Sequence, residues 1–189
     1  MARHRLLYLY LSERTRLFAD RLSLLHFSPE PGLSAVFKAR RNLRYATSWY
    51  EPDRPADFHL DLTKLAQPDE SWDVMIAYHV FEHIPDDGAG MREMFRVLKP
   101  GGFAVLQVPV RDEPDSLEDP TADEQTRITK FLQFDHVRYY GWKDFADRLT
   151  EAGFDVQIER YGLDLSPDLI REYGLDHTER IYIARKPRK

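Results

Sequence analysis

Short apolar runs alternate with amphipathic segments along most of the chain. Residues 74–78 form an apolar run that barely alternates, which is typical of a strand covered on both faces. In residues 92–98 the apolar positions are spaced for one helix face, and residues 103–110 form a second buried run. Pro100 and Gly101 separate the two, because proline cannot extend a helix and glycine permits a tight turn. The pattern predicts a strand–helix–strand unit of a parallel sheet.

The same alternation continues on both sides of this unit. Further strands are expected at residues 23–27, 43–49, 155–160 and 180–184, and further helices at residues 3–20, 33–40 and 142–154. The last two strands alternate more cleanly, which favours the edge of the sheet. The element order predicts an α/β fold: a Rossmann-like three-layer sandwich with a mostly parallel sheet and an antiparallel C-terminal hairpin.

The composition is that of an ordinary globular domain. The chain has 189 residues, of which 42% are apolar and 31% charged, so we expect residues 1–189 to form one domain with an N-terminal helix (1–20) and an acidic insertion or lid (111–130). The first helix could pack on the sheet, or form a lid or homodimer surface.

Charge and residue usage exclude several classes of partner and site. A net charge of −5 argues against a nucleic-acid partner, and the lack of cysteine excludes disulfides and zinc–thiolate sites. No apolar run approaches the roughly 18 residues of a membrane span, and the charged N-terminus does not resemble a secretory signal. The expected setting is the cytoplasm, without a membrane partner.

A tight S-P-E-P-G loop at residues 28–32 joins the first expected strand to a helix. Its two prolines remove hydrogen-bond donors, and Gly32 is its only glycine, so it is a poor phosphate cradle. It matches neither the G-x-G-x-x-G fingerprint nor a P-loop. A site at this loop would bind something other than a diphosphate.

Two motifs carry a resemblance to a known family. H-V-F-E-H-I-P at residues 79–85 and R-V-L-K-P-G-G at residues 96–102, supported by L-D-L-T around Asp61, resemble the small-molecule branch of the class I S-adenosylmethionine-dependent methyltransferases. The S-P-E-P-G loop and D-H-V-R-Y-Y-G at residues 135–141 resemble a bacterial subgroup whose substrates include hydroxyl-bearing small molecules such as sugars. The resemblance spans roughly residues 20–186.

The resemblance implies S-adenosylmethionine as cofactor. It places the following residues around it: Phe27, Glu30, Gly32, Trp49, Glu51, Asp61, Leu62, Tyr78 and His79. Trp49 stands near the position of the usual ribose-binding acid, so either Glu51 takes that role or Trp49 stacks on the adenosine. Asp61 would accept from the adenine amino group; alternatively, it caps the turn at Thr63. Glu30 would face the methionine ammonium.

Methyl transfer to a hydroxyl needs a base that removes the proton as attack proceeds. His136 is the first choice, with Asp135, Arg138 and Tyr139 at the acceptor. In the alternative interpretation Asp135 caps a turn, Arg138 pairs with it and His136 is incidental. His79 follows the strand end where the sulfonium should lie, so it is the second candidate.

Metal binding has a weaker basis in the sequence. His79 and His83 are four residues apart, but they lie in the expected loop and turn after a strand and do not form a helical zinc pair, so no transition-metal site is expected. Mg²⁺ could bind Asp135 or the Asp and Glu residues of 112–124, although a solvated acidic loop is the alternative. Glu82 and His83 are expected to have structural roles, and His26 to lie in the core.

These observations predict an S-adenosylmethionine-dependent O-methyltransferase that acts on a small hydroxylated acceptor, such as a sugar or glycoside. An N- or C-methyltransferase on the same fold is one alternative. The other is a methyltransferase-like domain that has lost catalysis and serves as a binding or scaffold subunit, for which the single glycine of the loop at residues 28–32 is the motive.

Overall fold

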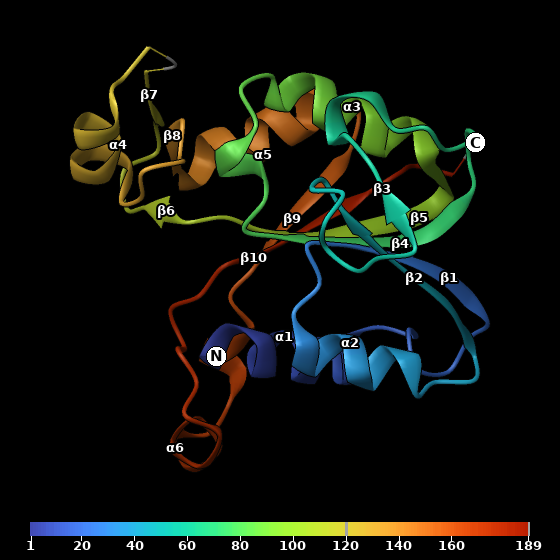
Figure 1. Ribbon diagram of the computed structural model, residues 1–189. Coiled ribbons are helices and arrows are strands. Elements are labelled where there is room, and N and C mark those ends of the chain that lie inside the picture. Colours follow the sequence, from blue (N-terminus) through green and yellow to red (C-terminus); the bar gives the residue numbers. More distant parts are fainter. Residues whose placement is uncertain (120, 189) are drawn as a thin grey trace.

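A central sheet lies between two layers of helices in the computed structural model, which describes residues 1–119 and 121–188 (Figure 1). The strands of this sheet are β1 (Leu22–Phe27), β2 (Leu43–Trp49), β3 (Phe58–His59), β4 (Trp72–Tyr78), β5 (Leu98–Gln107), β9 (Asp155–Glu159) and β10 (Ile181–Arg185). Within the described residues their order is β3-β2-β1-β4-β5-β10-β9, and β10 runs antiparallel to both of its neighbours. The predicted Rossmann-like α/β fold is confirmed.

Helices cover both faces of the sheet. On one side lie α1 (Ala2–Arg14), α2 (Pro31–Lys38) and α6 (Pro167–Tyr173), and on the other α3 (Asp87–Val97) and α5 (Trp142–Glu151) (Figure 1). Single 3₁₀ turns occur at η1 (Leu62–Lys64), η2 (Phe81–His83) and η3 (Tyr161–Asp164). No helix in the described part of the chain is long and apolar enough to cross a bilayer.

The acidic insertion has its own structure. It contributes β6 (Val110–Arg111), β7 (Leu117–Glu118) and α4 (Glu124–Phe131), and β8 (Arg138–Gly141) pairs between β6 and β7 in a small second sheet. This sheet and α4 lie together at one end of the molecule (Figure 1).

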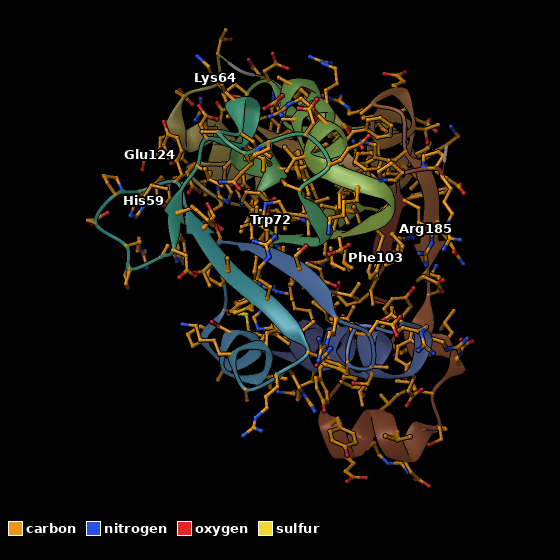
Figure 2. All side chains as sticks on the ribbon, turned by 90° about the vertical axis from the view of Figure 1, so that its right-hand side faces the viewer. His59, Lys64, Trp72, Phe103, Glu124 and Arg185 are labelled. Atoms are coloured by element: carbon orange, nitrogen blue, oxygen red, sulfur yellow. The ribbon has the colours of Figure 1, made fainter. Side chains whose placement is uncertain are left out.

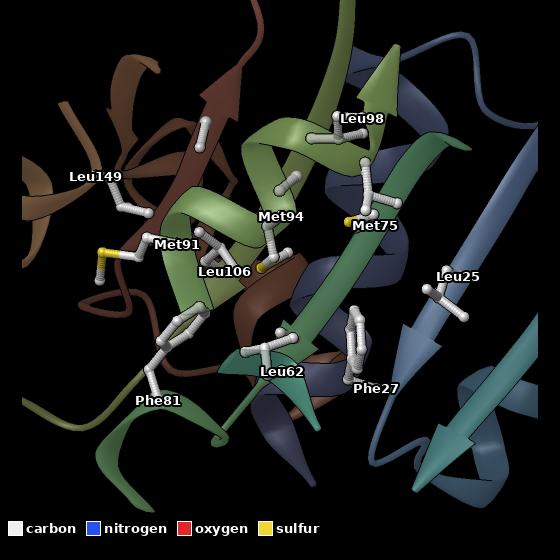
Figure 3. Close-up of a cluster of buried hydrophobic side chains, with 14 of the residues drawn as sticks. Leu25, Phe27, Leu62, Met75, Phe81, Met91, Met94, Leu98, Leu106 and Leu149 are labelled. Atoms are coloured by element: carbon white, nitrogen blue, oxygen red, sulfur yellow. The ribbon is translucent and has the colours of Figure 1, made fainter. Parts of the chain in front are cut away.

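Each central strand buries side chains on both faces. Adjacent residues of a strand point to opposite sides, so Met75 packs in the cluster under α3 and α5 (Figure 3), whereas Ile76 packs under α1 and α2. Side chains fill both spaces between sheet and helices, with Trp72 fully buried at the start of β4 (Figure 2). A strand covered on both faces is what the short apolar run at residues 74–78 predicted.

The structure corrects the sequence interpretation at the C-terminus. The edge position expected for the last two strands is right for β9 and wrong for β10, which lies between β5 and β9. Ile181 and Ile183 pack under α1, and Tyr182 and Ala184 pack under α5, so β10 is apolar on both of its faces. The first helix is shorter than predicted and ends at Arg14.

A polar contact fixes the amino ends of the two central strands. The Asp73 carboxylate on β4 accepts from the Ser23 backbone N–H on β1 at 2.8 Å and from Lys99 Nζ at 2.8 Å. Burial tends to raise the pKa of Asp73, but the hydrogen bonds from Lys99 and Ser23 outweigh burial and hold that pKa below its usual value.

Asp73→Asn should therefore lower the free energy of unfolding by about 1–3 kcal/mol at pH 7, because a charged acceptor is lost. A carboxyl group whose pKa is lower in the folded state stabilises the fold fully above its unfolded-state pKa. This stabilisation is lost as the pH falls through the folded-state pKa. The deficit of the variant, measured by urea unfolding, should thus shrink below about pH 4. Asp155→Asn, at an exposed strand position, is the control, and an equal deficit in that variant would contradict the assignment.

Candidate functional site

A cavity of about 770 Å³ opens where the carboxyl ends of β1, β2 and β4 meet. Parallel strands place their carboxyl ends at one edge of the sheet, and ligands of open α/β sheets bind there. Its lining includes these residues singled out from the sequence: Phe27, Glu30, Trp49, Glu51, Asp61, Leu62, Tyr78, His79 and Asp135.

Two non-glycine residues with left-handed backbone follow the strand ends. Ser28 comes directly after β1 with φ 46°, and His79 directly after β4 with φ 54°, and both line the cavity. Such backbone costs about 1–3 kcal/mol and persists where the surroundings over-determine it. The His79 N–H donates to the Gln107 carbonyl at 2.8 Å, which carries the β4–β5 pairing past the last paired residue of β4.

His79 is oriented by a buried carboxylate. Its Nδ1 lies 3.0 Å from Glu82 Oε1, and the Glu82 side chain is only 1% exposed. A carboxylate accepts, so Nδ1 is the donor in this contact. His79 Nε2 and Glu82 Oε2 are both buried, and neither has a hydrogen-bond partner among the described residues.

The turn that carries Glu82 is held from the other side by β8 and the loop before it. The Val137 N–H donates to the Glu82 carbonyl at 2.9 Å. The buried Arg138 guanidinium donates to the carbonyls of Phe81 at 3.2 Å and Pro85 at 2.8 Å. Arg138 lies outside the described lining of the cavity, and its guanidinium also pairs with Asp87 at 3.6 Å and with Glu118 at 3.5 Å.

His136 also lies outside that lining. It is 4% exposed and its Nδ1 donates to the Phe131 carbonyl at 2.7 Å. Burial lowers the pKa of His136. The hydrogen bond to the Phe131 carbonyl and the charge of Glu82 raise it, but burial outweighs them. Its ring stands edge-on to that of His83, with centroids 4.8 Å apart. Asp135 contacts His83 Nδ1 at 3.2 Å, so the Asp135–Arg138 pair of the alternative interpretation is not the arrangement found.

The first helix forms part of the cavity wall, which sequence reasoning missed. Met1, Arg3 and His4 line the cavity, and His4 Nε2 lies 2.9 Å from Glu30. His26 Nε2 approaches the same carboxylate at 3.2 Å. Burial tends to raise the pKa of Glu30, but its interactions with His26 and His4 outweigh burial and lower it. The apolar stripe in the first helix indicated packing, and gave no signal for these polar contacts.

Asp61 makes the capping contact that the sequence offered as the alternative. It lines the cavity, and its Oδ1 accepts from the Thr63 N–H at 2.8 Å, which caps η1. Trp49 lies under the Arg54 guanidinium, 4.7 Å from the ring centroid. Gly32 is outside the described lining; a Cβ added there would meet nothing within 4 Å.

A second cavity, of about 490 Å³, adjoins the first and shares His79 and Arg3 with it. Its wall is polar and includes Gln107, Asp112, Tyr139, Arg160, Asp176, Glu179 and Arg180. Gln107 Nε2 donates to Glu179 at 2.6 Å, and burial together with Asp176 raises the pKa of Glu179. Tyr139, expected at the acceptor, therefore lies in this second cavity. Asp112 was singled out only as a possible Mg²⁺ ligand. The remaining residues were missed, because segments far apart in the chain come together here through the pairing of β5 with β10.

The acidic insertion does not gather its carboxylates. Asp112 contacts Arg180, Glu118 contacts Arg148, and Asp123 caps α4. In the described part of the chain, the group with ligand-like spacing is instead Glu82, His83 and His136, whose candidate ligand atoms lie within 4.8 Å of one another. The structure thus offers no support for Mg²⁺ at residues 112–124.

The larger cavity suits a polar organic ligand. Its volume lies within the usual range for cofactor sites of about 300–1,000 Å³. Buried polar atoms on its wall lack partners among the described residues: Arg3 Nε, Ser48 Oγ, His79 Nε2 and Asp135 Oδ1. Unpaired buried groups are costly, and a ligand with an amine, a carboxylate and hydroxyls would satisfy them.

Comparison with known proteins gives a consistent picture. The model of a family described as a methyltransferase domain matches residues 1–158. A relative from Mycolicibacterium smegmatis, named "Probable S-adenosylmethionine-dependent methyltransferase", is 33% identical over 99 residues, covering 52% of this chain and 35% of the relative. The 2-methyl-6-phytyl-1,4-hydroquinone methyltransferase of Synechocystis is 29% identical over 116 residues, covering 60% and 36%. The chain thus spans about a third of the length of these two relatives.

Among solved structures, the [4+2]-cyclase SpnF superposes with a TM-score of 0.65 at 19% identity, covering 98% of this chain and 82% of that one. At this identity the likeness concerns the fold.

Gly32→Ala should leave the affinity for S-adenosylhomocysteine within about twofold of the parent, since the added Cβ meets open space and the backbone N–H remains. The free energy of unfolding of the variant should equal that of the parent or exceed it by up to about 1 kcal/mol, because alanine favours a helix more than glycine does. Calorimetric titration and thermal unfolding measure both. A tenfold loss of affinity would mean that a ligand approaches the backbone at Gly32, as the sequence-based prediction has it.

Proposed function

The chain belongs to the methyltransferase domain family, and on that premise we propose that it transfers a methyl group from S-adenosylmethionine to a hydroxyl of a small polar acceptor. The position and hydrogen bonding of His79 carry this proposal. His79 stands at the junction of the two cavities with an unpaired Nε2 and a buried carboxylate behind its Nδ1.

The larger cavity is the cofactor site in this proposal. Glu51, two residues beyond β2, accepts from the ribose hydroxyls, and Asp61 uses its second oxygen for the adenine amino group. The negative charge of Glu30 faces the ammonium, and Arg3 faces the carboxylate. Trp49 supplies an apolar wall. The sulfonium then lies beside His79, after β4.

The bound cofactor supplies an electrophilic methyl group on a sulfonium. The oxygen–carbon bond forms as the sulfur–carbon bond breaks, and S-adenosylhomocysteine leaves. His79 Nε2 accepts the proton of the acceptor hydroxyl, and Glu82 holds the ring in the tautomer that leaves Nε2 free. The burial of His136 and its bond to Phe131 favour His79 for the direct role over His136.

The acceptor occupies the second cavity. Its wall is rich in paired donors and acceptors, such as Gln107 with Glu179 and Asp112 with Arg180, and Tyr139 adds an aromatic face. Such a wall recognises several hydroxyls better than an apolar chain, which supports a sugar or another polyol. The hydroquinone methyltransferase among the relatives makes a phenolic acceptor the second class for an activity screen.

His79→Asn should lower kcat about 100-fold or more, because loss of a general base costs about 10²–10⁴-fold. Asparagine tolerates left-handed backbone, so the affinity for S-adenosylhomocysteine should stay within about threefold. Turnover is measured as methyl transfer to a panel of sugars, polyols and phenols, with the methylated atom assigned by NMR. His59→Asn, at an exposed position on β3 that lines neither cavity, is the matched control.

Parent-like turnover in His79→Asn together with its loss in His136→Asn would return the base role to His136. Methylation at nitrogen or carbon would replace the O-methyltransferase proposal.

Glu51→Gln should weaken binding of S-adenosylhomocysteine about tenfold, since a charged hydrogen bond to the ribose contributes about 1.5 kcal/mol or more. Calorimetric titration measures the affinity, with Glu151→Gln on the exposed face of α5 as control. If the parent chain itself binds no cofactor at millimolar concentration, the enzyme proposal fails and the scaffold alternative holds.

A further inference from the structure

Glu82, His83 and His136 come together at the end of the larger cavity, where the turn η2 meets the segment before β8. One candidate ligand atom from each lies within 4.8 Å of the others. The Val137 N–H bond to the Glu82 carbonyl and the Arg138 bonds to the same turn hold the two segments together. The three side chains are thus brought close by rigid backbone contacts, as a preorganised site requires.

Both imidazoles are oriented through Nδ1. His136 Nδ1 donates to the Phe131 carbonyl at 2.7 Å, and His83 Nδ1 lies 3.2 Å from the Asp135 carboxylate. A ring that donates through Nδ1 keeps its lone pair on Nε2. Metal-binding histidines characteristically donate their other nitrogen to a backbone carbonyl or a carboxylate in this way.

The third group is a buried carboxylate with an unsatisfied oxygen. Glu82 is 1% exposed, its Oε1 contacts His79, and its Oε2 has no hydrogen-bond partner among residues 1–119 and 121–188. A buried carboxylate oxygen without a partner is costly. A cation beside Oε2 would remove this cost, and the bond from His79 would orient the ligating carboxylate.

We propose that Glu82, His83 and His136 bind one divalent first-row transition ion, with Zn²⁺ as the best match. Two imidazoles and one carboxylate form a ligand set that Zn²⁺ takes in open sites. Ligand atoms around a tetrahedral ion are about 3.5 Å apart, so the cluster closes on the ion by small side-chain rotations. Mg²⁺ is a poor match because it prefers oxygen ligands.

His83 and Asp135 line the larger cavity, whereas Glu82 and His136 are outside its described lining, so an ion held by this cluster would be reached from the cavity on the His83 side. This consequence, which rests on the proposed function, assigns the ion a role in holding an oxygen of the acceptor near His79. The binding site itself does not depend on that role.

The test is titration of the full, untagged chain with Zn²⁺ and Co²⁺, followed by calorimetry and by the visible absorption of bound Co²⁺. We expect one ion per chain, no comparable binding of Mg²⁺, and a rise in thermal midpoint on adding Zn²⁺. His83→Gln and Glu82→Gln should each weaken binding more than about tenfold. His136→Asn should do the same; its thermal midpoint without metal reports whether it folds.

His59→Gln, at an exposed position on β3, is the control and should bind like the parent. Equal affinity in the parent and in His83→Gln, or no binding of either ion by the parent, would overturn the site. S-adenosylhomocysteine is titrated in parallel. Cofactor binding without metal binding overturns only the metal site, and metal binding without cofactor binding overturns only the proposed function.

Discussion

The burial of one carboxylate, that of Glu82, constrains the whole functional end of the molecule. A charge that is nearly inaccessible to water must find polar partners. The partner of its first oxygen is His79, whose left-handed backbone holds it directly at the end of β4. The Glu82 backbone carbonyl fixes the segment before β8 through Val137. One turn thus links the central sheet, the cavity wall and the small second sheet.

The local pattern of apolar and polar residues was sufficient to predict most of the fold, because buried strands and amphipathic helices each have a recognisable pattern over consecutive residues. The strand at residues 74–78 and the helix after it illustrate this. The interior place of β10 was misjudged, although the consecutive residues Ile181 to Ala184 are all apolar and buried, as in the central strand β4. The short α6 buries none of its residues, so it left no apolar stripe to find.

The cavity lining divides in the same way. Phe27, Trp49 and Tyr78 were predictable because each ends a strand, and parallel strands end at one edge of the sheet. The cluster of His83 and His136 was not, because its members come from segments far apart in the chain. Spacing along a helix detects only metal sites whose ligands are close in sequence. The group with ligand-like spacing here is assembled by tertiary contacts, so that criterion does not detect it.

The two carboxylate oxygens of Glu82 have different surroundings. Oε1 orients a histidine that both cavities share, while Oε2 has no hydrogen-bond partner in the described part of the chain, and one carboxylate oxygen lies within 4.8 Å of two further imidazoles. A cation beside Oε2 would draw negative charge from the carboxylate and so weaken it as the acceptor for His79. The two proposed roles, proton acceptance by His79 and metal binding at His83 and His136, therefore share the Glu82 side chain.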